Sequence, residues 1–134
     1  LGGTVAREVA RELPERVSLV VTLGSPVVGG PKYTAASVAL RDRGLDLDWI
    51  ERGVALREAE PIRVPIVAVV SPSDAVVGRS AAQDRYSKRV RHVEIDAPHM
   101  SLCFRPEVWR IVVLMTLSSE TLWLPSPRAA MRSR

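Results

Sequence analysis

Cysteine is nearly absent from this 134-residue sequence, in which Cys103 is the single example. One thiol cannot form a disulfide within the chain, and no group of Cys and His residues has the spacing of a zinc site. The longest mainly apolar run, IVVLMTL at 111–117, falls far short of the roughly 20 residues that span a bilayer. No basic segment followed by an apolar core opens the sequence, so no secretory signal is visible. These absences favour a cytoplasmic protein without a membrane span, a metal or an organic cofactor.

Aromatic residues are also scarce, because Phe, Trp and Tyr together occupy only six positions. The net charge is +4, but the last ten residues contain Arg128, Arg132 and Arg134 and no acidic residue. The remainder of the chain is therefore close to neutral. Nucleic-acid-binding modules combine a basic surface with a recognisable reading motif. We therefore expect no nucleic-acid partner.

Apolar residues make up 46% of the sequence and charged residues 25%, which is the composition of a globular domain. The length fits a single domain, for which about 100–200 residues is usual. Helical and strand-like patterns alternate along the chain. The expected helices are 4–13, 33–42, 47–60, 80–90 and 106–117, and the expected strands are 17–21, 63–71 and 91–98. This alternation indicates an α/β fold in which helices flank an open parallel sheet.

The first expected helix is amphipathic. Its apolar residues recur at helical spacing and should face the sheet; they are Val5, Ala6, Val9, Ala10 and Leu13. The charged residues between them should fill the solvent face; they are Arg7, Glu8, Arg11 and Glu12. The second expected strand shows no alternation, which is typical of a strand buried on both faces. The third alternates and is expected near an edge of the sheet.

Polar and turn residues follow each of the expected strands. They are Gly24, Ser25, Pro26, Ser71, Ser73, Asp74, Asp96, Pro98 and His99. In open parallel sheets, functional residues collect beyond the carboxyl ends of the strands. An aspartate and a histidine on neighbouring strand ends can serve nucleophilic catalysis, because the carboxylate orients one imidazole nitrogen while the other takes a proton from a hydroxyl. The sequence thus predicts that Asp74 and His99 meet at one edge of the sheet.

The opening residues, LGG leading directly into a helix, have the pattern that follows the serine of a nucleophile elbow. In the motif G-x-S-x-G the serine occupies a sharp turn between a strand and a helix. The residue two positions later is small because the helix backbone passes close to the strand. We therefore expect a serine immediately before Leu1 and a strand before that serine. Ser25 also follows a strand but lacks this motif, so we interpret it as a turn residue.

Four segments together resemble the α/β-hydrolase superfamily, in particular its bacterial esterase and lipase-like members. They are LGG with the first helix, ERVSLVVTLGSPVVG at 15–29, VPIVAVVSPSDAVV at 64–77 and VRHVEIDAPHMSLCFRPEV at 90–108. The resemblance implies that residues 1–124 are the C-terminal part of such a domain, without its N-terminal strands. Residues 32–60 would then form a cap-like helical insertion, and 125–134 a disordered basic tail.

The resemblance also implies roles for individual residues. Asp74 would be the orienting acid, His99 the general base, and the backbone N–H of Leu1 one oxyanion donor. The substrate of the full-length protein would be a small-molecule or lipid-like ester, and no cofactor is implied. Family members often have Gly directly after the acid and Gly two residues after the base, where this sequence has Ala75 and Ser101.

Other interpretations stay open for several residues and for the function. Asp84 and Asp96 are competing acids, and His92 is expected to be structural because it lies on a strand. Cys103 is expected to pack as a small apolar residue. The chain is a fragment of a serine ester hydrolase, inactive alone, or else it is a non-catalytic α/β remnant or a fragment that binds a partner through an exposed sheet edge. The pattern gives no indication of the oligomeric state.

Overall fold

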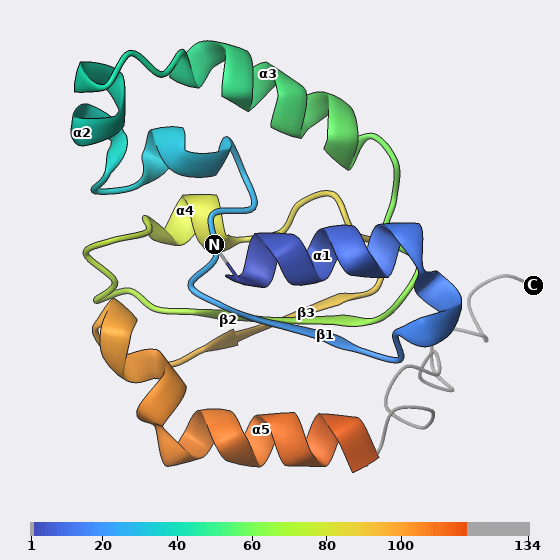
Figure 1. Cartoon of the computed structure of the whole chain (residues 1–134). Helices are drawn as coiled ribbons and strands as arrows, with labels where there is room; N and C mark the ends of the chain where they lie inside the picture. The colour runs from blue at the N-terminus through green and yellow to red at the C-terminus, as the bar shows by residue number, and fades with distance from the viewer. Residues whose placement is uncertain (1, 118–134) are drawn as a thin grey trace, which may run out of the picture.

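The computed structural model describes residues 2–117, so the expected oxyanion donor Leu1 and the expected tail at 125–134 lie outside the described residues. At the centre is a parallel sheet of three strands in the order β1-β2-β3. β1 is Val20–Leu23, β2 is Ile66–Val70 and β3 is Val90–Glu94. Figure 1 shows these strands crossing the middle of the molecule between helices. The expected class, an open parallel α/β sheet, is confirmed.

Five α-helices and three short 3₁₀ turns surround the sheet within the described part of the chain. The α-helices are α1 (Gly2–Glu12), α2 (Ser37–Asp42), α3 (Leu47–Glu58), α4 (Arg79–Ala82) and α5 (Pro106–Leu117). The 3₁₀ turns are Pro14–Arg16, Gly30–Tyr33 and His99–Phe104. None of the helices in residues 2–117 is long and apolar enough to cross a membrane.

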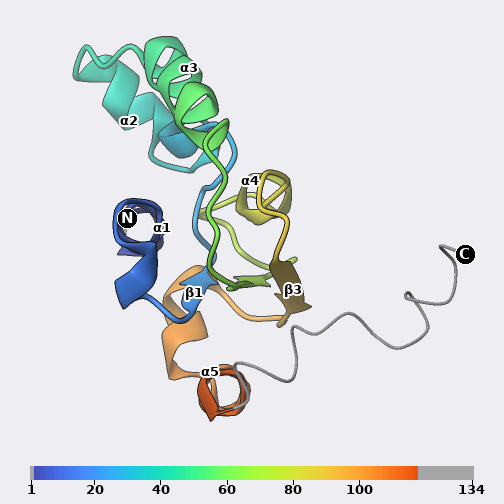
Figure 2. The ribbon, with the colours of Figure 1, turned by 90° about the vertical axis from the view of Figure 1, so that its right-hand side faces the viewer.

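The helices form layers on both sides of the sheet (Figure 2). α1 and α4 lie over one face, and α5 covers the other. α2 and α3 lie farther out, beyond α1 and α4, and form an additional layer on that side. Helices on both faces are what a parallel sheet requires, because neither face can be left in water.

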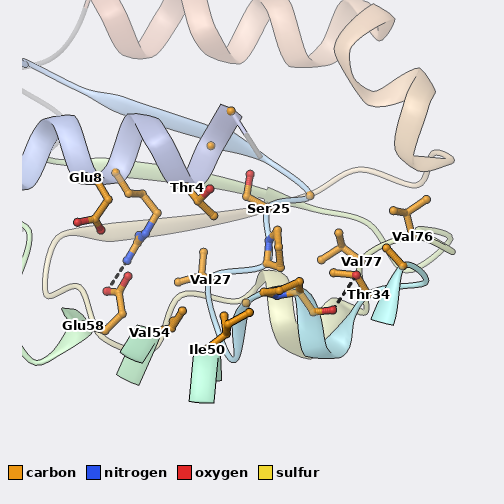
Figure 3. A pocket seen from close by; sticks show the side chains of 18 of the residues that line it. Thr4, Glu8, Ser25, Val27, Thr34, Ile50, Val54, Glu58, Val76 and Val77 are labelled. Atoms are coloured by element: carbon orange, nitrogen blue, oxygen red, sulfur yellow. Dashed lines mark hydrogen bonds and ion pairs between the residues drawn. The ribbon is translucent and has the colours of Figure 1, made fainter. Parts of the chain in front are cut away.

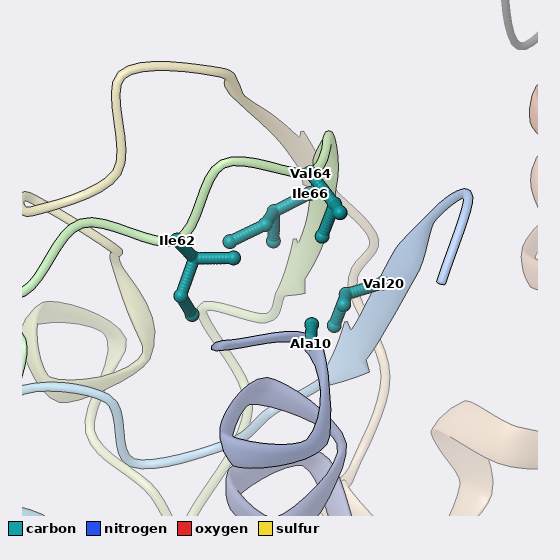
Figure 4. Close-up of a cluster of buried hydrophobic side chains, with 5 residues drawn as sticks. All are labelled: Ala10, Val20, Ile62, Val64 and Ile66. Carbon is teal, nitrogen blue, oxygen red and sulfur yellow. The ribbon is translucent and has the colours of Figure 1, made fainter. Parts of the chain in front are cut away.

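β2 is buried along its whole length, as its unbroken apolar sequence predicts. One apolar cluster packs α1 against β1 and β2 and consists of Ala10, Val20, Ile62, Val64 and Ile66 (Figure 4). A second cluster joins β2 to the segment after β3 and to α5, and consists of Val69, Ile95, Ala97, Leu102 and Val108. Successive side chains of a strand point to opposite faces, so the sheet is held from both sides. The loops that leave the strands therefore start from a rigid base.

The charged face of α1 differs from the expectation. The helical pattern places Arg7 in solvent, but this residue is only 2% exposed, whereas Val5 is 56% and Leu13 44% exposed. The cause is a pair of acidic partners: Arg7 Nη2 donates to Glu58 at 2.7 Å, and Nη1 donates to Asp84 at 2.5 Å. The predicted orientation of α1 is therefore wrong at these positions.

The Arg7 ion pairs connect three parts of the fold. Arg7 belongs to α1, Glu58 is the last residue of α3, and Asp84 follows α4. All three side chains are buried. Burying a charge costs several kcal/mol, and this cost is offset only where the charge has a well-placed partner. The ion pairs thus fasten the outer layer to the helices beneath it.

The helix expected at 80–90 is much shorter, because α4 ends at Ala82. Asp84 Oδ1 accepts hydrogen bonds from the backbone N–H groups of Tyr86, at 2.9 Å, and Ser87, at 3.0 Å. A side-chain carboxylate bound to backbone N–H groups in this way offers the chain an alternative to continuing the helix. The prediction is therefore wrong after Ala82, where the chain turns to present Asp84 to Arg7.

Acidification is expected to remove the contribution of Asp84 to stability. Burial acts to raise its pKa, but hydrogen bonds from Ser87 and the charge of Arg7 outweigh burial and hold the pKa below the usual 3.8. A carboxyl whose pKa is lowered on folding stabilises the fold above its unfolded pKa, and this contribution is lost as the pH falls through the folded value. The stability gap between the wild type and Asp84→Asn should be constant at neutral pH and shrink below about pH 4.

Urea unfolding of the protein at pH 7 and pH 3 measures this gap. Asp42→Asn serves as the control, because Asp42 is exposed on α2 and its replacement should matter little at either pH. An Asp84→Asn gap that is unchanged between pH 7 and pH 3 would contradict the expectation.

Candidate active site

Asp74 and His99 meet at the carboxyl edge of the sheet, as the sequence predicts. Asp74 lies in the loop after β2, and His99 begins the 3₁₀ turn that follows β3. His99 Nδ1 is 2.7 Å from Asp74 Oδ2. The Asp74 side chain is 1% exposed and that of His99 is 26% exposed. The carboxylate is therefore buried behind an imidazole that reaches solvent.

Asp74 is held by hydrogen bonds at both oxygens. Its Oδ1 accepts from the backbone N–H groups of Val76 and Val77, each at 2.8 Å, and its Oδ2 faces His99. An ionised carboxylate can only accept hydrogen bonds, and its match in this contact is the His99 tautomer that carries the proton on Nδ1. The neutral imidazole then carries its free lone pair on Nε2. This tautomer is the one that can take a proton from a hydroxyl.

Gly24 provides the space that the Asp74–His99 pair occupies. It directly follows β1, its N–H donates to the carbonyl of Val69 at 2.9 Å, and its φ is +51°. A Cβ at this position would lie 2.5 Å from Asp74 Oδ2 and 3.1 Å from His99 Nδ1. A glycine is required both by this close approach and by the left-handed backbone.

Gly24→Ala is expected to destabilise the protein and separate Asp74 from His99. The left-handed backbone costs about 1–2 kcal/mol for a residue with a Cβ, and the collision adds about 1–3 kcal/mol. Gly44→Ala is the matched control, since Gly44 has a φ of +82° and nothing within 4 Å of an added Cβ. Thermal unfolding of both variants should show the larger loss for Gly24→Ala. Equal losses would mean that the close approach to the pair has no consequence.

A cavity of about 910 Å³ opens beside His99. The start of α1 lines it at Gly2 and Gly3, and α3 lines the opposite side. Figure 3 shows apolar side chains around it, among them Val27, Ile50, Val54, Val76 and Val77. The buried Arg7–Glu58 ion pair forms part of the same lining. The cavity can therefore hold an apolar group next to the imidazole.

Ser25 lies against the first turn of α1. It is 5% exposed, and a Cβ on Gly3 would collide with its hydroxyl. Figure 3 shows Ser25 on the cavity wall, on the side of α1. The small side chains of Ser25 and Gly3 let the helix start close to the end of β1, so the contact is one of packing.

The remaining candidate residues lie apart from the Asp74–His99 contact. Asp96 accepts a hydrogen bond from Ser73, and Asp84 pairs with Arg7. His92 is exposed on β3. Cys103 is exposed as well, so the expectation that it packs as a small apolar residue is wrong. Its 3₁₀ turn buries Leu102 instead.

Two buried polar residues near the site have roles that the sequence did not predict. Arg7 lines the cavity, and its partners lie 51 and 77 residues away in the chain, so helical periodicity contains no signal for it. The sequence placed Ser71 among the residues at the strand ends. It gave no sign of the hydrogen bond from Ser71 to Ala97, in the loop that carries His99. Within residues 2–117, no group of His, Cys, Asp or Glu side chains could hold a metal ion.

No family model and no curated protein matches the sequence. Solved structures of similar fold include two crystal forms of the Pyrococcus furiosus esterase Pf2001. The first has a TM-score of 0.59 and 20% identity over 92% of this chain, and the second has 0.51 and 17% over 86%. The chain spans about half the length of that esterase, 51% in one form and 49% in the other. At such identities the likeness concerns the fold alone, and the chain has the α/β architecture of part of an esterase.

Proposed function

We propose that this chain supplies the acid and the base of a serine ester hydrolase, with the nucleophilic serine directly before Leu1. Asp74 is the orienting acid and His99 the general base. The observation that carries the proposal is the 2.7 Å contact between His99 Nδ1 and Asp74 Oδ2. The start of α1 supports it, because Gly2 and Gly3 line the same cavity as His99. A residue that precedes this helix would therefore lie at the cavity, beside His99.

In the proposed reaction, His99 Nε2 takes the proton of the serine hydroxyl while the serine oxygen attacks the ester carbonyl. The tetrahedral oxyanion is stabilised by backbone N–H groups, of which that of Leu1, the residue before Gly2 in the sequence, is one. The proton then passes from His99 to the departing alcohol, and an acyl-serine remains. Water, activated by His99 in the same way, hydrolyses the acyl-serine and restores the enzyme. Asp74 keeps the imidazole in the required tautomer throughout.

The outer helices shape the substrate in this proposal. α2 and α3 would act as a cap over the cavity, within the insertion expected at 32–60. The cap side carries Ile50 and Val54, and the opposite wall carries Val27 and Val77. These apolar walls favour an ester with an apolar acyl or alcohol group over a charged one.

Hydrolysis of p-nitrophenyl butanoate tests the proposal. The full gene product, expressed from its own start codon, should hydrolyse this ester, because it would contain serine, histidine and aspartate together. The 134-residue chain alone should show no hydrolysis above its own His99→Ala variant, since triad members act as a unit. His99-dependent hydrolysis by the 134-residue chain, or an inactive full gene product, would contradict the proposal.

A second candidate function is partner binding without catalysis. The apolar side chains of α1 and of the residue after it favour it, because Val5, Val9 and Leu13 are between 44% and 56% exposed. β1 also forms an edge of the sheet within the described residues, and such an edge can accept another strand. The two candidates differ in the activity of the full gene product, which only the hydrolase candidate requires.

A further inference from the structure

A buried serine joins the loops that carry Asp74 and His99. Ser71 directly follows β2 and is 2% exposed. Its hydroxyl donates to the carbonyl of Ala97 at 2.7 Å. The same oxygen accepts from the N–H groups of Ala97 and Ser73, each at 3.1 Å. These three hydrogen bonds use the full capacity of a hydroxyl, which has one donor and two acceptor sites.

The partners of Ser71 stand next to the candidate catalytic residues in the sequence. Ser73 directly precedes Asp74, and Ala97 is two residues before His99. A second link lies at the surface, where the Ser73 hydroxyl donates to Asp96. Both links lie beyond the last paired residues of β2 and β3. The two loops are therefore joined directly, at the point where the sheet no longer joins them.

We propose that Ser71 is a positioning residue for the Asp74–His99 pair. Its hydroxyl holds the loop after β2 and the loop after β3 at the separation that gives the 2.7 Å contact. The inference rests on the proposed function, in which an error of about 1 Å in the placement of a catalytic group costs about 100-fold in rate.

Removal of the hydroxyl leaves the buried backbone groups of Ala97 without these partners. In Ser71→Ala, the N–H and the carbonyl of Ala97 and the N–H of Ser73 all lose their bonds to Oγ. Buried polar groups without partners are costly, so the loops will shift to reach water or other partners. The shift changes the distance between Asp74 and His99, although the hydrogen bonds of the Ser71 hydroxyl go to neither of them.

The test follows the Nδ1 proton of His99 by NMR in the full gene product. In the wild type this proton should resonate far downfield of the backbone amides, because it is hydrogen-bonded to a buried carboxylate. In Ser71→Ala its exchange with water should be about tenfold faster, the equivalent of losing one or two net hydrogen bonds. The kcat for p-nitrophenyl butanoate should fall by about 10- to 100-fold with KM nearly unchanged. Ser71→Thr, which keeps the hydroxyl, should recover most of both signals.

Two further variants separate positioning from stability. Val67→Ala removes apolar volume from the same buried strand and should lower the melting temperature without changing the His99 proton. Ser71→Cys fills nearly the same space as serine with a weak donor and acceptor. It takes the place of Ser71→Ala if the alanine variant does not fold, and it should show the same faster exchange.

The outcomes distinguish this inference from the proposed function. A wild-type His99 proton signal that persists unchanged in Ser71→Ala and Ser71→Cys overturns the positioning role and leaves the proposed function standing. An inactive wild type that still shows the proton, with faster exchange in the Ser71 variants, overturns the proposed function and supports the role of Ser71 in holding the pair. A wild type without the downfield proton overturns both.

Discussion

Under the proposed function, replacing His99 by alanine is expected to lower kcat for ester hydrolysis by the full gene product by about four orders of magnitude or more. The reason is that no other described group stands where His99 does, at the open edge of the sheet with its Nδ1 bound to a buried carboxylate. In the proposed mechanism, the serine hydroxyl keeps its proton without the imidazole and is a weak nucleophile. KM should change little, because the cavity walls remain. The measurement is steady-state hydrolysis of p-nitrophenyl butanoate.

His92→Ala is the matched control for this experiment. His92 is exposed on β3, so its loss should leave kcat within about twofold of the wild type. Substitutions at such surface positions usually change the free energy by no more than about 0.5 kcal/mol.

Asp74→Asn should reduce kcat by a factor similar to that of His99→Ala, because an amide no longer fixes the imidazole tautomer. Asp96→Asn is the corresponding control for the competing acid and should have a much smaller effect. A large effect at His92 or Asp96, with a small one at His99 or Asp74, would contradict the assignment.

Arg7→Ala is expected to lower the free energy of unfolding by about 3–5 kcal/mol. Arg7 is 2.7 Å from Glu58 and 2.5 Å from Asp84. The substitution leaves Asp84 buried without its arginine partner, while Glu58 keeps only Arg11, at 3.1 Å. Since domains are stabilised by only about 5–15 kcal/mol in total, the loss should be visible as a large fall in the urea midpoint of the full gene product. The proposed ester hydrolysis should fall as well, because Glu58 ends α3, which lines the cavity.

Arg57→Ala provides the comparison for Arg7→Ala. Arg57 also pairs with acidic residues of α1, Glu8 among them, but it lies at the surface, where ion pairs contribute little. Its replacement should therefore change the urea midpoint far less. If Arg7→Ala and Arg57→Ala have similar small effects, the buried ion pairs do not fasten the outer layer.

The sequence predicted the sheet and the central contact because both depend on local patterns. β2 is an unbroken apolar run, and such a run between turn residues is typical of a doubly buried strand. Once the strands are parallel, their carboxyl ends must meet at one edge. Asp74 and His99 could therefore be placed together from their positions after two strands, without any knowledge of the distance between them.

The features that the sequence did not predict depend on contacts between distant residues. Arg7 is buried only because Glu58 and Asp84 arrive from other elements, so the periodicity of α1 gave the opposite result. The short α4 depends on the Asp84 side chain, which binds backbone N–H groups. These hydrogen bonds compete with helix formation, and the helix propensities of single residues do not include them. Ser71 was placed correctly at a strand end, but its bridging role requires the loop of Ala97 beside it.

The most direct test of the central claim is covalent labelling of the full gene product with a fluorophosphonate, followed by peptide mass spectrometry. A fluorophosphonate reacts with a serine whose hydroxyl is activated by a neighbouring base. We predict a single labelled serine, directly before Leu1, and loss of the label in His99→Ala but not in His92→Ala. Labelling of Ser25, or labelling that does not depend on His99, would contradict the account.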